Sequence, residues 1–156
     1  MKKEQFDIKD IDIHERIKDE SGFIAQIKAI AGQPAKLNSM TIATDGEKIF
    51  FDVHIQPAVN ECVVAISRYL SPCYVTEEND TENALYKIRR FNLMLPENYP
   101  EENITAVCNI VYDYITSRCL QQWYMLTKSD DANVSAAKAQ TSMTLLLDIL
   151  SARKKP

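Results

Sequence analysis

The sequence has 156 residues and a formal net charge of −4 at neutral pH. Hydrophobic residues make up 46% of it and charged residues 26%, which are ordinary values for a globular domain with its own core. The acidic balance excludes binding to nucleic acid through overall positive charge, so we expect no specific nucleic-acid binding. No run of about 18 apolar residues occurs, and we expect no contact with a membrane. No apolar stretch follows the lysines near Met1, so we expect synthesis in the cytoplasm without a signal peptide.

The N-terminal part is expected to be a short arm followed by a helix. In residues 1–9, Phe6 and Ile8 alternate with polar residues, which is typical of an extended segment. From about Asp10 the apolar residues recur at helical spacing instead. This change of period predicts that the arm ends and the first helix begins at that point.

A second helix is expected after residues 44–47, Thr-Asp-Gly-Glu, which fit a capping box. In a capping box the Thr hydroxyl and the Glu carboxylate each bind a backbone N–H at the helix start. Apolar residues from Phe51 onward fall on one helical face, with Pro57 inside the pattern. Residues 49–55 also alternate between apolar and polar, as a strand would. We predict a helix because the cap and the apolar face agree, and the two helices then occupy residues 10–71.

Residues 73–95 are expected to form a β-hairpin. A polar stretch at 77–83 provides the turn, and Phe91 and the residues after it alternate as a strand does. The apolar face changes near Arg89 and Arg90, which predicts a β-bulge there. The free edges of a hairpin are a known route to pairing with a neighbouring chain.

Residues 101–153 are expected to form an antiparallel pair of helices. Apolar residues recur at helical spacing over residues 104–126, and Asp130 and its neighbours are good N-caps for a following helix. So short a connection makes the two helices antiparallel neighbours. We therefore predict a single domain over residues 1–156. Its fold class is mainly α: a four-helix bundle-like domain with a β-hairpin inserted between the second and third helices.

No residue pattern in the sequence is specific for catalysis, a cofactor or a metal. None of the three glycines is followed by the Gly-Lys-Ser/Thr of a phosphate-binding loop. Only His14 and His54 could act as imidazole bases or ligands, and neither has a second His or Cys at a ligand spacing. We interpret His14 as a surface residue and His54 as a packed one. We expect no catalytic residues, no cofactor and no metal, and hence no enzyme.

The four cysteines have no CxxC spacing. Cys108 and Cys119 lie three turns apart on one predicted helix, which is too far for a disulfide between them. We expect free, buried thiols at these two positions and at Cys62 and Cys73.

Several aromatic and basic side chains are candidates for contact with another protein. Trp123 and Tyr124 could anchor an interface, where such residues often dominate the binding energy, or could equally form the core at the closed end of the helix pair. The cluster of Lys87, Arg89 and Arg90 could contact phosphate, although a solvated strand face is the favoured interpretation. The interface candidates are Trp123, Tyr124, Tyr74, Tyr86, Arg89 and Arg90.

The segment from Phe91 to Pro156 combines several features. It contains FNLMLPENYP, then VYDYITSRCLQQWYMLT inside the long helix, then KSDDANVSAAKAQTSMTLLLDILSARKKP. This combination resembles a group of small prophage-encoded proteins of the Bacteroides type. Those proteins are similar in turn to the helical head–tail connector (adaptor) family, whose subunits form a ring between portal and tail. The resemblance covers residues 91–156, agrees only in layout with residues 45–70 and the following hairpin, and implies no catalytic residues.

The resemblance implies a non-enzymatic structural protein of a phage or prophage, a head–tail connector or neck component. Its partners would be further copies of itself, in a homo-oligomer, and other phage structural proteins of the virion. Two alternatives stay open. A small helical protein-binding or regulatory module would have an exposed apolar groove between helices. An enzyme with an unfamiliar site would need His54 or the cysteines to cluster with acids in a pocket.

Overall fold

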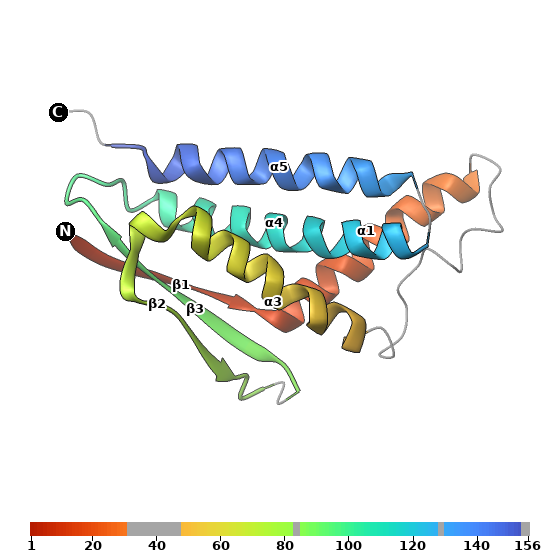
Figure 1. The fold of residues 1–156 in the computed structure, drawn as a ribbon, viewed down its shortest axis with the longest axis horizontal. Coiled ribbons are helices and arrows are strands. Elements are labelled where there is room, and N and C mark those ends of the chain that lie inside the picture. Colours follow the sequence, from red (N-terminus) through yellow and green to blue (C-terminus); the bar gives the residue numbers. More distant parts are fainter. Residues whose placement is uncertain (31–47, 83–84, 128–129, 154–156) are drawn as a thin grey trace.

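The computed structural model describes residues 1–30, 48–82, 85–127 and 130–153 (Figure 1). Its elements, in chain order, are β1 (Lys2–Lys9), α1 (Asp10–Ile30), α3 (Lys48–Ala65), the 3-10 helix η3 (Ser67–Tyr69), β2 (Leu70–Asn79), β3 (Lys87–Leu95), α4 (Asn103–Leu126) and α5 (Asp131–Leu150). The capping box expected at residues 44–47 lies outside the described residues.

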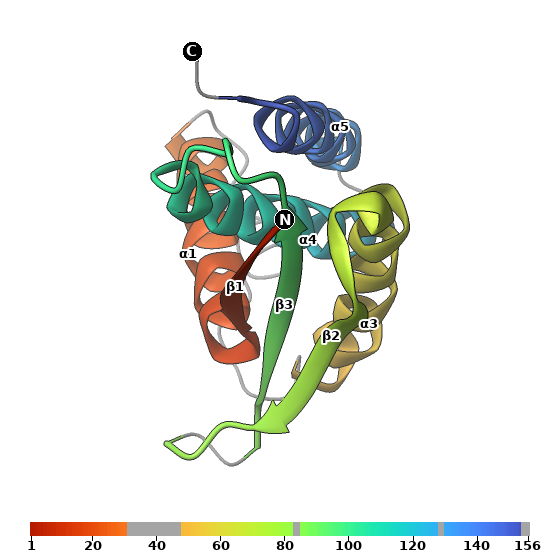
Figure 2. The same ribbon diagram turned by 90° about the vertical axis from the view of Figure 1, so that its left-hand side faces the viewer.

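The described elements are arranged in three layers (Figures 1 and 2). The first layer is an antiparallel sheet in the order β1-β3-β2. The second consists of α1, α4 and α3, which lie across one face of the sheet with α4 in the middle. The third layer is α5 alone, which packs chiefly on α4 and runs antiparallel to it. The helix pair expected over residues 101–153 is therefore confirmed.

The predicted fold class, a four-helix bundle-like domain with an inserted β-hairpin, is wrong. The segment expected to be an N-terminal arm is a strand, and all of Lys2–Lys9 pairs with β3. The helices therefore bury their apolar faces against a sheet of three strands as well as against one another. Burial explains this pairing, because Phe6 stacks on Phe91 with ring centroids 4.9 Å apart and Ile8 is fully buried. The fold is of the α+β class, with helices segregated to one face of an antiparallel sheet.

The predicted hairpin is present, but its irregularity is not where the sequence placed it. Strands β2 and β3 pair antiparallel, with a register shift between Leu70 and Val75 on β2. The pairing of β1 with β3 runs unbroken through Arg89 and Arg90. The apparent change of apolar face arises because Arg89 itself points inward and is buried, so the strand alternation continues without a bulge there.

Residues 49–55 are helical, as predicted, and belong to α3. Phe51, Ile55 and Cys62 are fully buried on one face of this helix, so its apolar periodicity reports the core correctly. Pro57 lies inside the helix and is exposed on the opposite side. The missing N–H of a proline is tolerated at such a site because water can reach the carbonyl that loses its donor.

A buried ionic cluster centred on Arg89 joins four elements of the fold. The guanidinium of Arg89, only 3% exposed, binds both carboxylate oxygens of Asp10 at the start of α1, at 2.9 and 3.2 Å. It also donates to Glu77 of β2, at 2.8 Å, and to the side-chain oxygen of Gln56 on α3. Neither sequence interpretation of Arg89, a phosphate contact or a solvated strand face, is correct. The cluster fixes the start of α1 and the middle of α3 relative to the sheet.

We predict that Arg89→Ala lowers the free energy of unfolding by about 3–5 kcal/mol, because Asp10 is left as a buried, unpaired charge. Urea denaturation followed by circular dichroism measures this change. The matched control is Arg90→Ala, since Arg90 is the next residue of β3 and forms a partly exposed ion pair with Asp7. Exposed pairs contribute little, so the control should change stability far less. Equal losses in both variants would contradict the assigned role of Arg89.

Candidate interaction surface

The aromatic interface candidates at the end of α4 pack inside the fold. Tyr124 has no exposed surface, and its buried hydroxyl has no hydrogen-bond partner among the described residues. Trp123 is half-buried, with its ring centroid 5.6 Å from that of Phe50 and 5.8 Å from that of Phe51. The sequence left two roles open for Trp123 and Tyr124, an interface anchor or the core at the closed end of the helix pair. This packing fits the second role.

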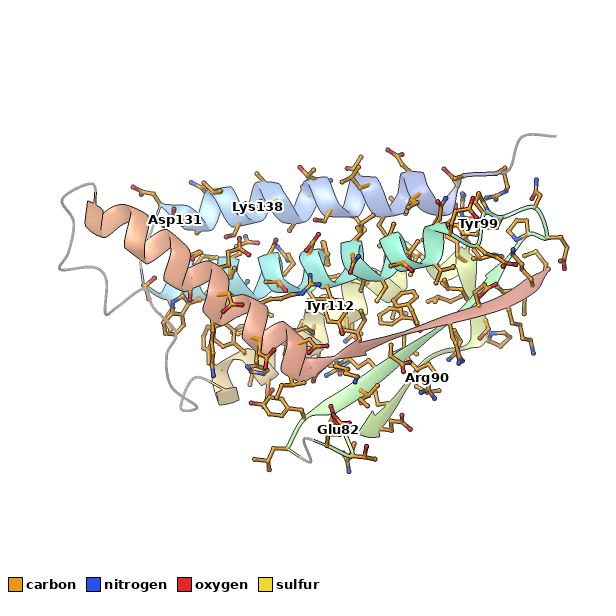
Figure 3. The ribbon with its side chains drawn as sticks, turned by 180° about the vertical axis from the view of Figure 1, so that it is seen from behind. Glu82, Arg90, Tyr99, Tyr112, Asp131 and Lys138 are labelled. Carbon is orange, nitrogen blue, oxygen red and sulfur yellow. The ribbon has the colours of Figure 1, made fainter. Side chains whose placement is uncertain are left out.

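The candidates on the hairpin do not gather on one face either. Arg90 lies on the outer face of the sheet (Figure 3), where it binds Asp7 at 2.9 Å, and this contact raises the pKa of its guanidinium. Tyr86 is half-buried with its ring against His14, at 5.3 Å between centroids. The side chain of Tyr74 lies outside the described residues. Arg89 is buried in the ionic cluster, Arg90 lies on the outer face of the sheet and Tyr86 packs against His14. These three candidates therefore do not form one surface.

His14 was expected at the surface, and this is wrong. The imidazole is 5% exposed, and its Nε2 lies 3.0 Å from a carboxylate oxygen of Asp52 on α3. Aromatic rings of Phe51 and Tyr86 contact it edge-on. Its carboxylate partner lies in another helix, so nothing near His14 in the sequence could reveal the pair. His54 is half-buried against Phe50, as expected of a packed histidine.

The described cysteines are free thiols, as predicted. Cys62 and Cys119 are buried, and Cys108 is half-buried. Burial raises the pKa of the Cys119 thiol to about 12 and raises that of Cys62 as well. Protonated thiols are poor nucleophiles and poor metal ligands. The described part of the chain contains no group of three or more His, Cys, Asp or Glu side chains that could hold a metal ion.

One edge of the sheet is covered by α4. The backbone N–H of Lys9 donates to the hydroxyl of Tyr112, at 2.8 Å, and the Cys108 thiol lies 3.7 Å from the carbonyl oxygen of Asp7. Figure 3 shows Tyr112 above this end of β1. Strand β3 has neighbours on both sides, so within the described residues β2 is the hairpin strand that keeps a free edge.

An apolar groove lies between α3, α4 and α5, with a volume of about 570 Å³. Tyr114 lines it from α4, and its hydroxyl donates to Glu61, which also binds Arg118 at 3.0 Å. Its remaining lining residues are Pro57, Asn60, Val64 and Ala65 of α3 and Met143 of α5. We call this site the α3–α5 groove.

A second groove, on the other side of α5, is lined mainly by charged residues, serines and threonines. It lies between α1, α4 and α5 and has a volume of about 670 Å³. Two ion pairs cross it, Arg16 with Asp113 at 3.1 Å and Lys138 with Glu20 at 2.8 Å. The buried hydroxyl of Thr116 lines it without a hydrogen-bond partner among the described residues. Four of the five charged residues that line this groove are paired with one another in these two ion pairs, so it offers less to an apolar partner than the α3–α5 groove does.

Large apolar side chains are exposed on both helices that border the α3–α5 groove. Val53 and Val64 of α3 are 63% and 76% exposed, and α5 exposes Val134, Leu145 and Leu147. Val64 lines the α3–α5 groove, whereas Val134 lines the second groove, on the other side of α5. Large exposed apolar side chains that border a groove are candidates for contact with a partner. The sequence did contain a signal for Val53 and Val64, because both lie off the helical face on which Phe51 lies.

Comparisons with known proteins found no match to this chain among protein families, curated proteins or solved structures. None of the helices in the described ranges combines the length and the apolar character needed to cross a membrane.

We predict that the Cys119 thiol makes the fold less stable as the solution becomes alkaline. In the unfolded chain this thiol ionises near its ordinary pKa of 9.0, and in the folded chain only near 12. Between these values the unfolded state holds fewer protons, so this group lowers the free energy of unfolding by about 1.4 kcal/mol per pH unit.

Urea denaturation of Cys119→Ala and of the unchanged protein, from neutral pH to above pH 9, tests this. The variant lacks the titrating thiol, so it does not lose this part of the stability at alkaline pH. Its deficit, the difference in free energy of unfolding between the unchanged protein and the variant, should therefore become smaller as the pH rises. Ile115→Val is the matched control, because it trims a buried, non-titrating residue on the same helix. Its deficit should not change with pH. A deficit of Cys119→Ala that stays constant would contradict the assignment.

Proposed function

We propose that this chain is a non-enzymatic structural protein of a phage or prophage, a head–tail connector or neck component. It would act through self-assembly and through contacts with portal or tail proteins. The observation that carries the proposal is the exposed apolar surface on α3 and α5, which lies outside the core formed by the described residues. The sequence resemblance, which is carried by residues 91–156, supplies the kind of assembly.

The position of α5 supports this role. It forms the outermost layer of the described structure and packs chiefly on α4 (Figure 2), and half of its residues are exposed. Over its 20 residues it carries charge only at Asp131, Lys138 and Asp148. The cores of protein interfaces are likewise depleted of charged residues. Burial of such apolar surface against another subunit contributes roughly 25 cal/mol per Å² to association, before the entropic cost of assembly is subtracted.

A small protein-binding module is the second candidate, and the α3–α5 groove favours it. That groove has an apolar lining along one flank of α3 and a polar triplet, Tyr114, Glu61 and Arg118, at its side. An amphipathic helix of a partner could lie in such a groove. In this case the chain itself would remain a monomer, and a dedicated partner would occupy the groove.

Absolute mass in solution, measured by light scattering behind a sizing column over a wide range of concentrations, tests the proposal. Self-assembly predicts a discrete oligomer, or a mass that grows with concentration above the 17.8 kDa of one chain. A mass that stays at 17.8 kDa up to the solubility limit would contradict self-assembly and favour the binding module.

A further inference from the structure

The outer face of α3 carries a stripe of four residues that point away from the core. Val53, Pro57, Asn60 and Val64 are all exposed and follow one another at spacings of four, three and four residues. This is the a/d spacing by which one helix packs along another. All four side chains are exposed in the described structure, and Pro57, Asn60 and Val64 also line the α3–α5 groove. We call these four residues the α3 stripe.

We propose that the α3 stripe packs antiparallel against the α3 stripe of a second copy, in a contact with two-fold symmetry. This inference rests on the proposed self-assembly and names the surface that carries it. The spacing four-three-four is the same when read in either direction. An antiparallel pair therefore places Val53 against the second copy's Val64 and Pro57 against the second copy's Asn60, each contact occurring twice. Self-complementarity of this kind is what an isologous interface requires.

The one polar residue of the stripe has a role in this pairing. Arg89 donates to the side-chain oxygen of Gln56, which turns the amide nitrogen of Gln56 toward Asn60. That nitrogen donates to the side-chain oxygen of Asn60 at 2.9 Å. The amide N–H groups of Asn60 make no hydrogen bond within the described residues, and they remain available to a partner.

An acceptor for these N–H groups lies at the facing position of the second copy. Pro57 has no N–H, so the carbonyl of Val53, four residues earlier, lacks its usual helical donor. In the antiparallel pair Asn60 lies against the second copy's Pro57, next to that carbonyl. The pairing thus joins an unused donor to an unused acceptor on both sides of the symmetry axis, which an unrelated apolar partner would leave unpaired.

The flanking charges are compatible with a second copy as the occupant. On the side of the stripe next to the α3–α5 groove, the same register brings His54 alongside the second copy's Glu61. On the opposite side it brings Gln56 alongside the second copy's Val63. No two like charges face each other in this register, whereas like charges at flanking positions disfavour the pairing of helices. The stripe is thus complementary to itself in spacing and in hydrogen bonding, and no like charges oppose the pairing.

A charge exchange across the proposed contact tests it, with sedimentation velocity of the full chain over a concentration series as the measurement. Val53→Glu and Val64→Lys, made singly, each place a charge against a valine of the second copy and should weaken self-association by roughly tenfold or more. The double variant places the new carboxylate of one copy against the new ammonium of the other, at two symmetric sites. It should recover association relative to both single variants.

Leu85→Glu is the matched control, because Leu85 is an exposed apolar residue between β2 and β3, outside both α3 and α5. It should leave association unchanged, and circular dichroism should show every variant folded, since the substituted residues are exposed. Association that none of the α3 variants weakens would overturn this inference and leave the proposed self-assembly standing. Weakening by both single variants without recovery in the double variant would overturn the antiparallel register. A wild-type chain that never associates would overturn both the inference and the proposed self-assembly.

Discussion

The arrangement of the sheet and its helices depends on the buried guanidinium of Arg89. It lies on the inward side of the central strand, and Asp10, Glu77 and Gln56 bind it from three other elements. A buried ion is tolerated only when it is paired and hydrogen-bonded, so α1, β2 and α3 must meet around it in one way. The same contact orients Gln56 and thereby Asn60 on the outer face of α3. One cluster therefore connects the interior of the fold to the surface proposed for assembly.

Local patterns were sufficient for the elements that depend on neighbouring residues. The periodicity of α3, α4 and α5 predicted those helices, and strand alternation predicted β2 and β3. The pairing of β1 was missed because it joins Lys2 to Leu95, far apart in the sequence, and because Phe6 and Ile8 give only a brief alternation. Without that strand the helices had only one another to pack against, which led to the bundle prediction. Arg89 was misread for the same reason, since its partners come from distant segments.

The candidate contact residues show that residue type does not distinguish a buried side chain from an exposed one. Composition identifies Tyr124 as a strong interface residue, but only the layered packing shows that it is buried. The exposed Val53 and Val64 were detectable in principle, because both lie off the helical face that Phe51 defines. Exposed valines are common, however, and a single exposed valine does not indicate an interaction site. The three-dimensional structure makes these two valines candidates for contact, because they lie on an exposed helix face beside an apolar groove.

The central claim is that two copies meet through α3, and isotope-filtered nuclear Overhauser spectroscopy on a mixture of labelled and unlabelled chains tests it most directly. Within one chain the methyl groups of Val53 and Val64 lie on a helix about 16 Å apart, too far for a signal between them. The account predicts an intermolecular signal between Val53 of one copy and Val64 of the other. Its absence, in a sample that is associated by its measured mass, would contradict the account.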